Sequence, residues 1–70
     1  MNNILQELGN NIRAERNRLK LSQAELAERV GVSLPHISKI ESGLSDIKFT
    51  TLIALLKALN IPFEKLYELN

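Results

Sequence analysis

The stretch LSQAELAERVGVSLPHISKIESG, residues 21–43, contains two short helical patterns separated by a glycine. In the first pattern, Ser22 is a favourable N-cap and Glu25 stands three residues later, which is the signature of a capping box. Apolar residues then recur at helical spacing, and Gly31 follows where a chain often leaves a helix through a left-handed residue. The sequence therefore predicts a helix over Gln23–Val30.

The second pattern predicts a helix over residues 34–42, with a proline at its head. Ser33 can cap this helix, and Pro35 then falls in the first turn, where its missing N–H has no intrahelical acceptor to lose. Ile37 and Ile40 lie three residues apart and are expected to point inward. The residues left facing outward are Leu34, His36, Ser38 and Lys39, with Pro35 at the rim. The two helices and the Gly31-Val32-Ser33 turn form a helix-turn-helix pattern.

The rest of the chain also favours helices, and no run alternates with period two for long enough to predict a strand. We expect a first helix over residues 4–19, a fourth beginning at Thr50 or Thr51, and a short fifth over residues 63–69. Gly9 lies inside the first helix and marks either a close packing contact or a frayed turn. The chain of 70 residues is thus predicted to be a single all-α domain, residues 1–70, with five helices.

Composition narrows the possible function classes. There is no cysteine, no run approaching the ~20 apolar residues of a membrane span, and no signal-peptide pattern, so we expect a soluble, cytoplasmic protein without a membrane partner. The net charge is only +1, but residues 13–39 hold six basic and three acidic residues. With a single histidine, no phosphate-binding loop and no metal-ligand spacing, the sequence argues against an enzyme, a cofactor or a metal site.

Residues 12–66 resemble the lambda-repressor-like helix-turn-helix family, the phage-repressor and xenobiotic-response-element type of regulator. The resemblance rests on Ile12-Arg13, Arg16, LSQAELAERVGVS (residues 21–33), ISKIESG (37–43) and LIALLKALNI (52–61). It implies a five-helix DNA-binding domain whose third helix lies in the major groove of double-stranded DNA. One departure is Lys20, which stands where glycine commonly ends the first helix.

The resemblance also implies site residues, position by position. The expected base contacts are Leu34, Pro35, His36 and Lys39, of which the first two can pack on a thymine methyl and Lys39 suits a guanine. The expected phosphate contacts are Ser22, Gln23, Ser33, Ser38, Ser42 and Lys48, the two cap serines serving first as caps. Arg16 and Glu41 match a pair that forms an internal salt bridge, which we interpret as structural.

A single domain of this size reads too few base pairs for specificity against a genome, so we expect a homodimer on an inverted repeat. The predicted interface is Ile53, Phe63 and Tyr67, unless the core itself uses these residues. The favoured function is a transcriptional repressor that excludes polymerase by occupancy. Two alternatives remain open: a restriction–modification controller that both activates and represses its own promoter, and an antitoxin-type module that binds a toxin or another protein partner.

Overall fold

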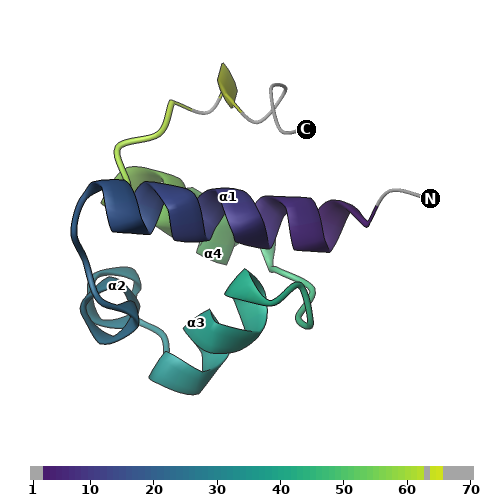
Figure 1. The fold of residues 1–70 in the computed structure, drawn as a ribbon, viewed down its shortest axis with the longest axis horizontal. Coiled ribbons are helices and arrows are strands. Elements are labelled where there is room, and N and C mark those ends of the chain that lie inside the picture. The colour runs from purple at the N-terminus through teal and green to yellow at the C-terminus, as the bar shows by residue number, and fades with distance from the viewer. Residues whose placement is uncertain (1–2, 63, 66–70) are drawn as a thin grey trace.

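In the computed structural model, which describes residues 3–62 and 64–65, the chain forms four α-helices joined by short turns (Figure 1). The helices are α1 (Ile4–Arg18), α2 (Gln23–Val30), α3 (Leu34–Glu41) and α4 (Phe49–Ala58). The all-α fold class is confirmed, but the predicted count of five helices is one too high for the described residues. Most of the segment expected as a fifth helix, residues 63 and 66–69, lies outside the described residues. At Glu64 and Lys65 the structure describes one turn, closed by a 2.9 Å bond from the Lys65 N–H to the Pro62 carbonyl.

Side-chain caps explain where three of the helices begin. The side chains of Asn3, Ser22 and Ser33 each accept a hydrogen bond from the backbone N–H three residues later. These bonds satisfy N–H groups that have no partner inside the helix. The fourth helix begins at Phe49 after Lys48, which makes no side-chain cap bond. The sequence predicted that this helix begins at Thr50 or Thr51, so the observed start is one or two residues earlier.

Each of the four helices is followed, within two residues, by a residue with positive φ. These residues are Lys20, Gly31, Gly43 and Asn60, with φ of 59°, 84°, 74° and 56°. The residue after each one donates its N–H to a carbonyl five positions back, at 2.9–3.0 Å, which is the bond of a Schellman motif. A lysine in this conformation costs roughly 1–2 kcal/mol. Lys20 adopts it here because the motif and the buried Leu21 hold the chain in that turn.

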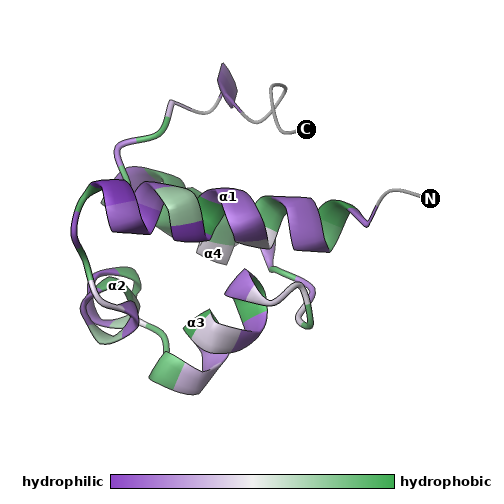
Figure 2. Ribbon diagram, viewed as in Figure 1, coloured by the Kyte–Doolittle hydropathy of each residue, from purple (hydrophilic) through white to green (hydrophobic). Residues whose placement is uncertain are grey.

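One hydrophobic core joins the helices, and α3 packs against both α1 and α2, while α2 also contacts α4. Figure 2 shows green hydrophobic and purple hydrophilic segments along the same helices, as expected for amphipathic elements. The core residues are Ile12, Leu21, Leu26, Ala27, Ile37, Ile40, Leu55 and Leu59. Among the described residues, no helix is both long and apolar enough to cross a lipid bilayer.

Gly9 marks a close approach of α1 to the last turn of α3. A Cβ atom placed on Gly9 would lie 2.5 Å from the carbonyl oxygen of Ile40 and 2.7 Å from that of Glu41. Gly9 is buried within an unbroken α1, so the interpretation as a frayed turn is wrong and the close packing contact is confirmed. The last turn of α3 is therefore seated directly on the backbone of α1.

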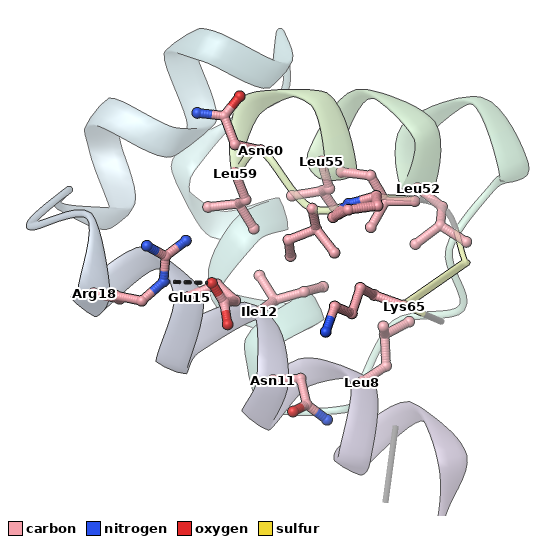
Figure 3. A pocket seen from close by; sticks show the side chains of 13 residues that line it. Leu8, Asn11, Ile12, Glu15, Arg18, Leu52, Leu55, Leu59, Asn60 and Lys65 are labelled. Atoms are coloured by element: carbon pink, nitrogen blue, oxygen red, sulfur yellow. Dashed lines mark hydrogen bonds and ion pairs between the residues drawn. The ribbon is translucent and has the colours of Figure 1, made fainter. Parts of the chain in front are cut away.

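A groove of about 420 Å³ runs between α1 and α4 (Figure 3). Apolar side chains of both helices line it, among them Leu8, Ile12 and Leu55, together with the polar side chains of Asn11 and Lys65. None of its lining residues is a predicted DNA contact. The candidate functional surface therefore lies elsewhere, on α2 and α3.

Candidate nucleic-acid interface

Helix α3 is anchored through one face and exposed on the other. Ile37 and Ile40 are buried in the core, while Leu34, Pro35 and Lys39 are exposed. Figure 1 shows the N-terminal end of α3 projecting away from α1. The exposed side chains of α3 are therefore free to contact a partner molecule.

Two residues predicted to face outward are more enclosed than expected. His36 and Ser38 are half-buried, because they flank Ile37 in the chain and so lie at the two edges of the packed face. The backbone N–H of His36 donates to the Ser33 hydroxyl at 3.2 Å, which ties the first turn to its cap. Lys39 lies on the opposite side of the helix and keeps the outward position that the sequence predicted.

The head of α2 is closed by a reciprocal pair of hydrogen bonds. The Glu25 N–H donates to the Ser22 hydroxyl at 3.0 Å, and the Ser22 N–H donates to the Glu25 carboxylate at 2.8 Å. The predicted capping box is therefore confirmed. The interaction with Ser22, chiefly through its backbone N–H and then through its hydroxyl, holds the pKa of Glu25 below its ordinary value.

A buried carboxylate links α1, α2 and α3. Glu41 is fully buried, and the structure brings Arg16 onto it through two bonds, Nε to Oε2 at 2.7 Å and Nη2 to Oε1 at 3.0 Å. Arg16 Nη1 also donates to the Leu21 carbonyl at 2.8 Å. Burial alone would raise the pKa of Glu41, but hydrogen bonds from Arg16 and Gln23 and the guanidinium charge hold that pKa below its usual range.

Gln23 takes part in this cluster, although the sequence predicted only a phosphate contact for it. The side chain is half-buried, and its Nε2 donates to Glu41 Oε1 at 3.1 Å. An amide nitrogen carries two N–H groups, so one donor remains for another acceptor. The bond to the Glu41 carboxylate thus orients the Gln23 amide and, with it, the second N–H group.

Arg13 also belongs to this cluster, although the sequence predicted no functional role for it. Its Nη2 donates to the Glu41 backbone carbonyl at 3.2 Å, and its Nε lies 3.5 Å from the Glu41 carboxylate. Its side chain remains 47% exposed. One signal was present in the sequence: Arg13 stands three residues before Arg16, so the two share a face of α1.

The other predicted site residues have simpler surroundings. Ser42 is exposed and its hydroxyl donates to the Ser38 carbonyl at 2.9 Å, while Lys48 is exposed at the start of α4. Of the predicted dimer interface, Ile53 is half-buried on α4, and Phe63 and Tyr67 lie outside the described residues. In the described part of the chain, no group of three histidine or acidic side chains is arranged to hold a metal ion.

Comparison with known proteins connects this geometry to a family. A family model described as helix-turn-helix matches residues 12–66, so the resemblance expected for these residues is confirmed. The chain is 41% identical, over 59 residues, to an uncharacterized HTH-type transcriptional regulator of Mycobacterium tuberculosis, covering 84% of this chain and 42% of that protein. The control protein C.SmaI of Serratia marcescens is also 41% identical over 59 residues, covering 84% of this chain and 70% of C.SmaI.

A solved structure agrees with the sequence relatives. The crystal structure of the restriction-modification controller protein C.AhdI from Aeromonas hydrophila superposes with a TM-score of 0.84, at 27% identity, over 89% of this chain and 94% of that one. The chain spans less than half the length of the mycobacterial regulator that it matches.

Proposed function

Because this chain belongs to the helix-turn-helix family, we propose that it binds double-stranded DNA in a sequence-dependent manner and regulates transcription. One observation carries the proposal: α3 buries Ile37 and Ile40, while it exposes Leu34 and Pro35 at its projecting N-terminal end and Lys39 in its last turn. An α-helix fits the major groove of B-DNA, where each base pair shows a distinct set of donors and acceptors.

The exposed residues of α3 supply two kinds of base readout. Leu34 and Pro35 pack against thymine methyl groups, which make apolar contacts in the major groove. Lys39 donates to a guanine, and His36 adds a donor or acceptor from the edge of the packed face. Loss of one such polar contact costs about 1–3 kcal/mol of specific affinity.

Phosphate contacts hold the helix in register. The free N–H of the Gln23 amide and the backbone N–H groups at the head of α2 favour an anion there. Polar residues around the two helices provide the remaining contacts, namely Ser22, Ser33, Ser38, Ser42 and Lys48. Removal of any of these contacts weakens binding to all sequences alike.

The binding unit in this proposal is a homodimer on an inverted-repeat operator. Ile53, which is only half-buried on α4, supports an interface on that helix, together with Phe63 and Tyr67. Two-fold pairing places two copies of α3 about one helical turn of DNA apart. Sedimentation should show a dimer that Ile53→Asp dissociates; a wild-type chain that stays monomeric at high micromolar concentration would contradict this part of the proposal.

Repression by occupancy is the mode of regulation that we propose, with the chain acting at the promoter of its own gene. C.SmaI and C.AhdI are named as a control protein and a restriction-modification controller protein, and this likeness supports a regulatory role for the chain. Activation of the same promoter is the alternative mode. In repression by occupancy, the protein excludes polymerase from the promoter once the protein concentration is high enough to occupy the operator.

Selection of bound duplexes from random DNA tests the proposal most directly. The selected sequences should contain an inverted repeat, and Lys39→Ala should weaken binding to them and relax the preference at one base pair. Arg18→Ala is the matched control: it removes an exposed cation of α1 that has no proposed contact with DNA or with the second protomer, and it should bind as the wild type does. Recovery of no preferred sequence, even at low ionic strength, would contradict the proposal and favour the antitoxin-type interaction module.

A further inference from the structure

Two guanidinium groups share one carboxylate at the junction of α1 and α3. Glu41 contributes one negative charge, while Arg13 and Arg16 contribute two positive charges. Arg16 is 12% exposed, and its Nε, Nη1 and Nη2 all have partners within the fold. The uncompensated positive charge therefore lies with Arg13, whose side chain is 47% exposed.

Arg13 is held next to the residues for which a phosphate contact is proposed. Arg13 Nε and Gln23 Nε2 both approach the same oxygen, Oε1 of Glu41, at 3.5 and 3.1 Å. The bond from Arg13 Nη2 to the backbone carbonyl of Glu41 places the guanidinium next to Ser42, the following residue in the chain. One arginine is thus fixed between the Gln23 amide and the C-terminal end of α3.

We propose that Arg13 is a further DNA-contacting residue, which binds a backbone phosphate together with Gln23. The proposal rests on the DNA-binding function proposed above. A guanidinium carries five N–H groups in a planar fork that suits phosphate oxygens. In Arg13 one of them donates to the Glu41 carbonyl and the Nε–H faces the Glu41 carboxylate, so the remaining N–H groups can donate to a phosphate. Because the fold already orients the side chain, little conformational entropy remains to be lost when a phosphate binds.

A purely structural role for Arg13 makes a different prediction. If Arg13 only supports Glu41, its replacement changes the stability of the fold but leaves the number of ions released on DNA binding unchanged. If it binds a phosphate, its replacement removes one released counterion, so the slope of log Kd against log salt falls by about one unit. The salt dependence of binding therefore distinguishes the two roles.

The experiment compares four chains by fluorescence anisotropy over a series of KCl concentrations, with a duplex carrying the selected site and an unrelated duplex of equal length. Arg13→Ala should weaken binding to both duplexes by about tenfold at low salt and reduce the salt slope by about one. Arg13→Lys keeps the charge and should keep the slope. Arg18→Ala is the matched control, because Arg18 also lies on α1, is 58% exposed and pairs with the carboxylate of Glu15.

Each result decides between the two roles. An unchanged slope for Arg13→Ala overturns the inference while the proposed function stands, provided that the wild type binds DNA. A wild-type chain that binds neither duplex overturns the proposed function and this inference with it. If Arg13→Ala does not fold, Arg13→Gln replaces it, since glutamine still offers an N–H to the Glu41 carbonyl but carries no charge; it should show the same loss of slope.

Discussion

Helices α2 and α3 are built to the same plan but differ at the third residue. Each has eight residues, begins after a capping serine and is followed by a glycine with positive φ, one or two residues beyond its last residue. In α2 the third residue is Glu25, whose carboxylate completes a capping box with Ser22. In α3 the third residue is His36, and the first turn contains no acidic residue.

This difference changes how strongly the first turn of each helix is stabilised. An acidic residue in the first turn stabilises a helix, both through the capping box and through the positive end of the helix dipole. Helix α3 lacks that stabilisation, and its first turn carries no negative charge. The compensation lies at its other end, where the buried Glu41 ties α3 to Arg16 of α1.

Removal of the Arg16–Glu41 ion pair, which ties α3 to α1, should have the largest effect on stability. Arg16→Ala leaves the Glu41 carboxylate buried with reduced compensation, so we expect a loss of about 3–5 kcal/mol in the free energy of unfolding by urea. The control is Arg18→Ala, which removes an exposed pair with Glu15 and should cost less than about 1 kcal/mol. Equal costs for the two variants would show that the Arg16–Glu41 pair stabilises the fold no more than an exposed ion pair does.

Acid should weaken the same anchor. The folded-state pKa of Glu41 lies below its ordinary value, so its contribution to stability is present above the unfolded pKa of about 4.3 and is lost as the pH falls through the folded pKa. Glu41→Gln, which cannot titrate, should be less stable than the wild type at pH 7, and the difference should shrink at acid pH. A difference between the two urea midpoints that stays constant with pH would rule out Glu41 as the responsible group.

His36→Glu makes the head of α3 resemble that of α2, and so sharpens the comparison. The introduced carboxylate can form a capping box with Ser33, so the urea midpoint should stay level or rise slightly. In the proposed binding mode, affinity for the selected duplex should fall about tenfold, because the added carboxylate is repelled by the DNA phosphates. His36→Gln can form the same box without the charge; if it binds DNA no better than His36→Glu, charge is not the reason that α3 lacks an acid.

The smallest effects should come from the caps themselves. Ser22→Ala removes one half of a capping box and should cost about 1 kcal/mol of stability. Ser33→Ala removes a single, longer bond from a helix whose first turn Pro35 already favours, and should cost about 0.5 kcal/mol. Thermal and urea unfolding of the two variants would measure the difference, and a larger cost at Ser33 would contradict this account of the two helix heads.

Local signals in the sequence predicted most of the helical architecture. The bounds of α2 agree with the prediction, because a serine cap and a glycine end are both read from neighbouring residues. The start of α4 was misplaced because Lys48 offers no side-chain cap, so nothing in the local sequence marks it. The role of Gly9 could not be decided from the sequence, because the backbone that excludes its Cβ belongs to residues 40 and 41.

In the candidate site, the sequence predicted the exposed face of α3 but not the contacts between helices. The spacing of Ile37 and Ile40 indicates which face of α3 is buried, and hence that Lys39 points outward. The bonds from Gln23 and Arg13 to Glu41 connect residues 18 and 28 positions apart. Such contacts depend on how the helices pack, so sequence spacing along one helix predicts only that Arg13 and Arg16 lie on the same side.

The way in which α3 begins and ends has an evolutionary consequence. Ser33 starts the helix, Gly43 closes its last turn, and two isoleucines hold it, so none of these tasks falls to Leu34 or Lys39. Mutations at those two positions can accumulate without a penalty to the scaffold. Related chains can therefore differ in the chemistry of this exposed surface while they keep the same fold.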